Sequence, residues 1–223
     1  PFYPQLQRSF QKAVSEPSSA TVRTRAGAAL GHLMGLQLRV EPVVLELVTG
    51  IEASLNGATV PVIGGAPGSE VDVGDSLAHA LAQVLQHVPQ DKVSENTRGA
   101  VARCVSATIT AADEPKETLK RGVAEVAAAL LLHSRAEIGP VLDRAVLTPE
   151  PVDVQFTAYM ICAALEIAPT QLHAAMERPA LIAQLVSQWT SDAPSVARPA
   201  REAREALKRV LPWTEDPSVQ DAL

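Results

Sequence analysis

Apolar residues recur at helical spacing through most of the chain, and proline or glycine separates one such run from the next. In 4–15 the stripe is Leu6, Phe10, Ala13 and Val14, with Pro4 suited to a first turn. Comparable runs cover 20–35, 42–55, 76–88 and about 94–111, 116–133, 137–147, 151–168, 171–176, 179–190 and 198–211. No strand pattern competes with them. The spacing therefore predicts an all-α fold.

The expected core is aliphatic. Apolar residues make up 47% of the 223 residues, but aromatic residues only 3%. Helices of about 12–18 residues joined by short turns describe antiparallel helix pairs, at the ~40-residue repeat of HEAT or armadillo solenoids. We expect a repeat region over 1–212 with about five pairs, a long surface loop or insertion at 56–76, and a frayed tail at 213–223.

The stretch SSATVRTRAGAALGHL, at 18–33, carries more small residues than an ordinary helix. Ser18 or Ser19 can cap this helix. Its inward residues are expected to be Val22, Ala26, Ala29, Leu30 and Leu33. Small residues let a helix approach its partner and the neighbouring pairs closely. A Val-Arg pair followed by small residues and a Leu-Gly step is typical of the second helix of a HEAT repeat, in which Arg23 would reach the loop or carbonyls of the adjacent repeat.

The first quarter of the chain resembles a more specific family. PFYPQLQR, SSATVRTRAGAALG and RVEPVVLELVTG look like the C-terminal part of the very large HEAT-repeat activators of the general amino acid control kinase. That kinase phosphorylates the alpha subunit of translation initiation factor two. The resemblance implies a cytoplasmic, non-catalytic scaffold that binds ribosomes through other regions. It also implies that this part docks the RWD domain at the kinase N-terminus, with basic residues contributing.

One basic row is a candidate for that docking. In ARPAREAREALKRV, at 197–210, Arg201, Arg204 and Lys208 fall on one helical face; Arg198 precedes them, and Pro199 is expected in the first turn. Glu202 and Glu205 flank the row, so one interpretation is a solvated face with ion pairs three and four residues apart. The other is a partner-binding row of Arg198, Arg201, Arg204 and Lys208 for an acidic surface. Trp189 and Trp213 flank this helix.

A second basic group lies near the start of the chain. It contains Arg8, Arg23, Arg25 and Arg39. Arg23 is expected to be structural, and Arg39 could bond helix ends in the turn between pairs. A partner-binding role for this group is the less favoured interpretation.

No constellation predicts an enzyme, a cofactor site or a metal site. GGAPG at 64–68 lacks the Lys and the Ser/Thr of a phosphate loop. His79 and His87 lie two turns apart on one helix without a third ligand nearby. Cys104 and Cys162 lie in apolar helical runs, which predicts buried structural thiols, although Arg103 beside Cys104 could lower its pKa.

The net charge of −6 argues against a general nucleic-acid-binding surface. No apolar run reaches the ~18 residues of a membrane span, and no secretory signal is present. Because the chain begins at Pro1, we expect a fragment of something longer, with exposed apolar edges that favour self-association. Two alternatives to kinase docking stay open: a generic HEAT spacer, or a ribosome- or RNA-contacting segment of a large scaffold.

Overall fold

The computed structural model describes residues 2–61, 70–111, 113–133, 135–147, 151–168, 184, 186–187 and 194–210. The all-α class is confirmed, since most of these residues lie in helices. The chain divides into two compact units, Pro1–Val126 and Ala127–Leu223. Each unit has its own helix packing and is described separately.

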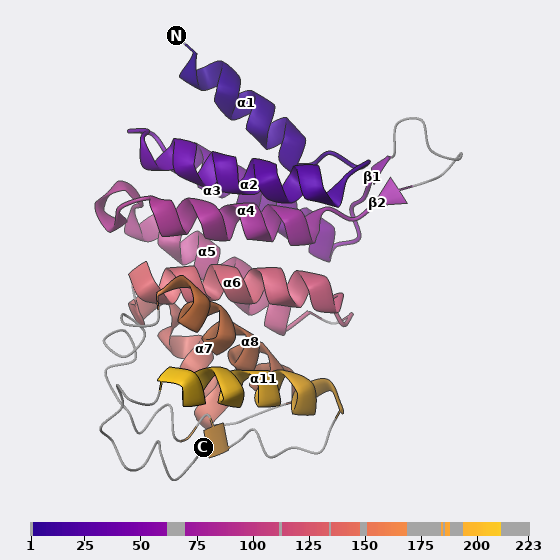
Figure 1. Cartoon of the computed structure of the whole chain (residues 1–223), viewed down its shortest axis with the longest axis vertical. Helices are drawn as coiled ribbons and strands as arrows, with labels where there is room; N and C mark the ends of the chain where they lie inside the picture. Colours follow the sequence, from indigo (N-terminus) through magenta and orange to yellow (C-terminus); the bar gives the residue numbers. More distant parts are fainter. Residues whose placement is uncertain are drawn as a thin grey trace. The chain divides into compact units, whose positions relative to one another are not determined.

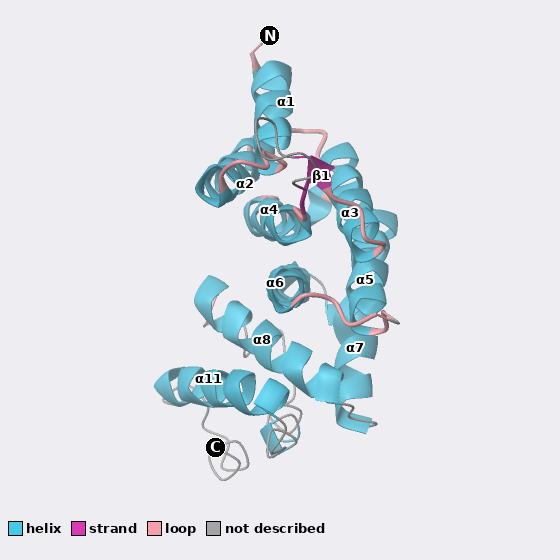
Figure 2. Ribbon diagram, turned by 90° about the vertical axis from the view of Figure 1, so that its right-hand side faces the viewer, coloured by secondary structure: helices cyan, strands magenta, loops and turns pink. Residues whose placement is uncertain are grey.

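The first unit is a stack of helix pairs. Its helices are α1 (Tyr3–Val14), α2 (Ala20–Gly35), α3 (Glu41–Leu55), α4 (Gly74–His87), α5 (Glu95–Ile109) and the start of α6 (Glu117–His133), with a single 3₁₀ turn at Gln90–Lys92. Helix α1 packs on α2 and α3 packs on α4, forming consecutive pairs. The second helices, α2 and α4, lie side by side in one layer, and α3 and α5 lie side by side in the other (Figures 1 and 2). This layering is the arrangement of an α-solenoid.

The approach of α2 to α4 depends on small residues. A Cβ atom added at Gly31 would lie 2.7 Å from the backbone oxygen of Gln83, and one at Gly27 would lie 3.2 Å from Ala80. Ala78 on α4 is fully buried, as is Leu30 on α2. The Ala- and Gly-rich composition of 18–33 therefore has the expected cause, which is close contact between stacked helices.

The start of α2 is fixed by a cap and by a buried arginine. The Ser19 hydroxyl accepts a hydrogen bond from the Val22 amide, so Ser19 is the capping residue. Arg23 is 7% exposed. Its Nε donates to the Ser76 hydroxyl on α4 at 2.8 Å, and its guanidinium donates to the Glu16 carbonyl at 3.0 Å. Arg23 therefore reaches the adjacent pair as predicted, but through the Ser76 hydroxyl; the carbonyl that it binds, that of Glu16, belongs to its own pair.

The expectation that Val22 points inward is wrong. Its side chain is 44% exposed. The face of α2 that meets α4 is centred on Arg23, Gly27 and Leu30, all of which are buried. Val22 lies about 100° from Arg23 around the helix, and this angle turns it away from α4.

The segment at 56–76 contains strands that the sequence did not predict. Val60–Pro61 (β1) pairs antiparallel with Glu70–Val71 (β2), with Val60 opposite Val71. Gly57, at φ +83°, ends α3, and α4 begins at Gly74 rather than at 76. Strands of two residues are too short to show a period of two, so only their pairing reveals them.

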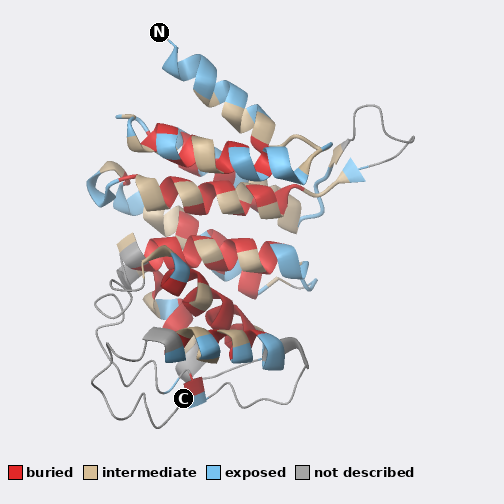
Figure 3. Ribbon diagram, viewed as in Figure 1, coloured by how far each residue is buried: buried red, intermediate tan, exposed pale blue. Residues whose placement is uncertain are grey.

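The second unit is built around α8 (Pro151–Ile167). This helix packs against α7 (Arg135–Leu147) and α11 (Pro194–Val210). Every residue from Asp153 to Ile161 is buried, as expected for a helix surrounded on all sides (Figure 3). Asp153 is 1% exposed and pairs with Arg144, whose Nε lies 3.1 Å from the carboxylate.

Helix α11 begins earlier than the sequence predicts. It starts at Pro194, so Pro199 lies inside the helix and not in its first turn. Interior proline removes one helical hydrogen bond. Pro199 and Ala200 are buried, so this part of α11 contributes apolar surface to the core of the second unit. The helices predicted at 171–176 and over most of 179–190, the tail at 213–223, and Trp189 and Trp213 lie outside the described residues.

Candidate partner-binding site on helix α11

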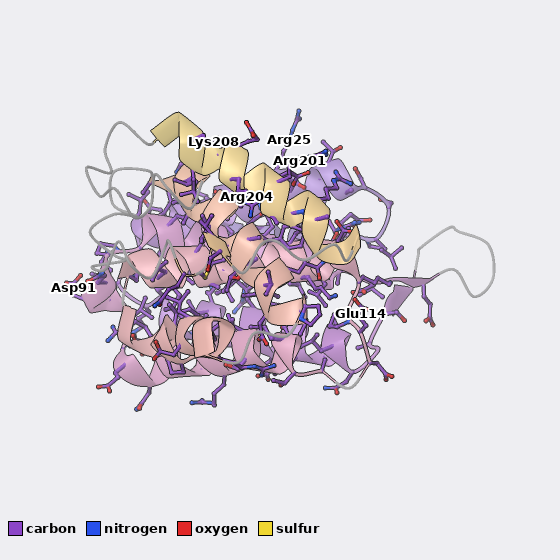
Figure 4. The ribbon with its side chains drawn as sticks, turned by 90° about the horizontal axis from the view of Figure 1, so that it is seen from below. Arg25, Asp91, Glu114, Arg201, Arg204 and Lys208 are labelled. Atoms are coloured by element: carbon purple, nitrogen blue, oxygen red, sulfur yellow. The ribbon has the colours of Figure 1, made fainter. Side chains whose placement is uncertain are left out.

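Helix α11 separates an apolar face from a charged one. Ala200, Ala203 and Leu207 are buried at spacings of three and four, and α11 packs on α8. The charged residues occupy the remaining circumference. Figure 4 labels three of them, Arg201, Arg204 and Lys208, along the helix.

Two of the four candidate cations are engaged in exposed ion pairs on the helix itself. Arg198 Nε lies 3.0 Å from the Glu202 carboxylate, and Lys208 Nζ lies 3.7 Å from that of Glu205. Such exposed pairs contribute only about 0.3–0.5 kcal/mol each. They restrain the two cations little, so both remain able to meet a partner's carboxylates.

Arg201 and Arg204 differ in their surroundings. Arg201 is exposed and has no hydrogen bond or ion pair within the described residues. Arg204 is half-buried, and its Nη2 donates to the Val186 carbonyl at 3.4 Å. The structure therefore gives Arg204 a contact inside the unit, while Arg198, Arg201 and Lys208 face solvent.

The second basic group is divided in the same way. Arg8, Arg25 and Arg39 are exposed, whereas Arg23 is buried in the α2–α4 contact. Arg39 has no described bond to a helix end. Lys92 binds the end of α2 instead, donating to the carbonyls of Gly35 at 3.3 Å and Gln37 at 3.0 Å. Sequence reasoning missed Lys92, because its position in a short connection gives no periodic signal.

The histidines and cysteines of the described chain form no reactive centre. His79 pairs with Glu125 on α6 at 3.0 Å, and this hydrogen bond raises the pKa of His79. His87 contacts the Gln83 carbonyl and packs edge-on against His32. Burial raises the pKa of the Cys104 thiol to about 12, which supports its structural interpretation over a reactive one. Cys162 is only half-buried, so full burial was wrong for this residue.

The part of the chain that the structure describes offers no candidate metal site and no candidate membrane span. No three His, Cys, Asp or Glu residues there converge as metal ligands. Among the same residues, no helix has the length and apolar character needed to cross a bilayer.

The stacked helix pairs of the first unit define a class, the helical-repeat proteins of α-solenoid architecture. No family model matches the chain. Among curated proteins, it is similar to the eIF-2-alpha kinase activator GCN1 of Saccharomyces cerevisiae, with 36% identity over 105 residues. That match covers 47% of this chain and 3% of the yeast protein.

Two further relatives match this chain over a similar number of residues. The stalled ribosome sensor GCN1 of Mus musculus is 36% identical over 115 residues, covering 47% of this chain and 4% of that protein. Protein ILITYHIA of Arabidopsis thaliana is 33% identical over 100 residues, covering 42% of this chain and 4% of the plant protein. The aligned part thus spans only a few per cent of the length of each relative.

Proposed function

We propose that this chain is a non-catalytic docking segment of a large cytoplasmic scaffold in translational control, and that it binds the RWD domain of the amino-acid-starvation kinase. The observation that carries the proposal is the 36% identity, over 105 residues, to a protein named as an activator of the eIF-2-alpha kinase. The stacked helix pairs support a scaffold role, because such stacks offer extended surfaces to partners.

The proposed contact surface is the α11 cation face, defined as Arg198, Arg201 and Lys208. Arg201 is the main contributor because it has no competing partner in the described chain. An acidic surface on the RWD domain would exchange the weak pairs of Arg198 and Lys208 for contacts across the interface. Exposed charges of this kind mainly speed association and set specificity. Binding should therefore weaken as salt is added.

The test is a calorimetric titration of the chain with the RWD domain at low and at physiological salt. We expect saturable 1:1 binding that weakens at the higher salt. The variant R198Q/R201Q/K208Q should lower the affinity at least fivefold and leave the melting temperature unchanged. Arg204 is kept, because changing it would also disturb the Val186 contact.

The matched control is R8Q/R25Q/R39Q, which removes the same charge from exposed positions of the first unit. Its affinity should stay close to that of the unchanged chain. If this control loses affinity and the α11 variant does not, the contact surface lies on the first unit. If the folded chain shows no binding at ~100 μM, RWD docking by this segment is wrong and a spacer role replaces it.

A ribosome contact is the second candidate. It is favoured by the name of the mouse relative, which is a stalled ribosome sensor. The net charge of −6 opposes direct binding to RNA. Co-sedimentation with ribosomes and an RNA gel shift at low salt separate the two functions. A ribosome contact requires that the chain binds ribosomes in the absence of the kinase domain.

A further inference from the structure

A pocket opens in the first unit where α3 and α5 end side by side. Its lining comes from the last turn of α3 and the residue after it, and from the end of α5 and the segment that follows: Glu52, Leu55, Asn56, Ala107, Ala111 and Asp113. The cavity volume is about 400 Å³. None of these residues belongs to the α11 cation face, and the charge of the pocket is opposite to that of the α11 cation face.

The charge of the pocket favours a cation. Glu52 and Asp113 are exposed carboxylates, and neither has a hydrogen bond or an ion pair within the described residues. Both α3 and α5 end here, and each helix C-terminus adds a partial negative charge of about half an electron. Two carboxylates and two helix ends therefore act on the same space.

The cation that neighbours the pocket on α5 is directed away from it. Arg103 lies one turn before Ala107 on α5, but the structure places its Nη1 near Gly99, one further turn toward the start of the helix. Burial raises the pKa of the Cys104 thiol, and the negative charge of Glu52 raises it further. The electrostatic effect of Glu52 therefore extends to the residues below the pocket.

The residues that line the pocket indicate which kind of cation it would bind. Leu55, Ala107 and Ala111 provide apolar surface, whereas the carboxylates and the Asn56 amide are polar. Lysine and arginine have this same division, with an aliphatic stem and a charged head. A bare metal ion would gain nothing from the apolar walls, and the described residues offer no three convergent ligands.

We propose that this pocket is a second docking site, which takes a lysine or arginine side chain from an extended segment of a protein partner. The stem lies on Leu55 and Ala107, and the charged head meets Glu52 and Asp113. Because no residue of α11 takes part in this site, a failure of RWD docking would not contradict this proposal, and a failure of this proposal would not contradict RWD docking.

The test uses the full chain and two synthetic peptides, followed by NMR of the backbone amides. One peptide carries a single lysine between glycines, with both ends blocked. The other carries acetyl-lysine at the same place, which keeps the stem and removes the charge. We expect saturable shifts at the amides of Asn56, Ala107 and Ala111 with the lysine peptide and none with the acetylated one.

Two variants test whether the lysine peptide binds at this pocket. E52Q/D113N should weaken lysine-peptide binding at least fivefold. D91N/E95Q removes two exposed carboxylates at the opposite end of α5 and should leave binding unchanged. Equal losses in both variants would show diffuse attraction to an acidic surface and overturn the proposal. Absence of shifts with the lysine peptide, or saturable shifts with spermine or Mg²⁺ alone, would overturn it as well.

Discussion

Charged residues whose partners lie far away in sequence connect the elements of the first unit. Arg23 joins the start of the α1–α2 connection, at Glu16, to Ser76 on α4. Lys92 binds the carbonyl of Gly35, the last residue of α2, and that of Gln37 just beyond the helix. Glu41 accepts hydrogen bonds from the Ser94 amide at 2.9 Å and the Thr97 hydroxyl at 3.1 Å, which ties α3 to the start of α5. Each contact satisfies polar groups that a helix end or a buried side chain would otherwise leave unpaired.

Replacing Arg23 with methionine should lower the free energy of unfolding by about 2 kcal/mol, because it removes two charge-assisted hydrogen bonds from a buried site. Urea unfolding followed by circular dichroism measures the change. R25M, at an exposed neighbour, should alter stability by no more than about 0.5 kcal/mol. Equal effects of the two variants would contradict the structural role of Arg23.

Acidification should remove the contribution of Glu41 to the stability of the folded chain. Hydrogen bonds from Ser94 and Thr97 hold the pKa of Glu41 below its ordinary value of 4.5. A lowered pKa in the folded state stabilises the fold above the unfolded-state value, and the effect disappears as the pH falls through the folded-state value. Melting temperatures of the unchanged chain and E41Q should therefore differ at pH 7 and converge as the pH is lowered through the folded-state pKa of Glu41. A difference that stays constant with pH would rule out this linkage.

At the scale of elements, the close approach of α2 to α4 is the most demanding contact. A side chain at Gly31 would collide with the backbone of α4 at Gln83, which cannot move as a flexible side chain can. Gly99 on α5 has no such neighbour, since an added Cβ would meet only the Arg103 side chain, at 3.5 Å. The two glycines therefore have different roles within similar helices.

The same substitution should have opposite effects at these two glycines. G31A should destabilise the chain by about 1–2 kcal/mol, because the overpacking cost exceeds the gain in helix propensity. G99A should stabilise it by about 0.5–1 kcal/mol through that propensity. Chemical denaturation of both variants gives the comparison. Stabilisation in both would mean that the α2–α4 contact can relax.

At the scale of the whole molecule, the distribution of exposed apolar surface indicates how chains meet each other. Phe2 is 74% exposed, Tyr3 52% and Leu6 45%, and all three lie at or beside the start of α1. Helix α1 packs mainly on α2, so much of its surface faces solvent (Figure 3). Exposed apolar side chains that gather at one end of a helix favour association.

We expect the chain to self-associate weakly at concentrations near ~100 μM through this surface. F2S/L6S should weaken that association at least threefold in sedimentation velocity runs over a concentration series. The control is L36S/L38S, which removes two exposed leucines from the turn after α2. If the control suppresses association and F2S/L6S does not, contacts at that turn drive it.

The all-α class and most helix bounds in the described chain follow from the sequence, because apolar spacing, capping serines and first-turn prolines act locally. The predicted 20–35 helix and the observed Ala20–Gly35 are the same segment, and Ser19 begins it as the pattern indicates. The engagement of Arg198 with Glu202 follows from their four-residue spacing on the same helix.

Only the tertiary structure decided the features that depend on neighbours distant in sequence. Val22 faces solvent because α4 lies against the face of α2 that carries Arg23. Arg204 differs from Arg201 because the Val186 carbonyl is within reach of its guanidinium. The pocket of Glu52 and Asp113 exists because α3 and α5 end side by side. Periodicity assigns a residue to one side of a helix, but the identity of the neighbour on that side is set by packing between helices.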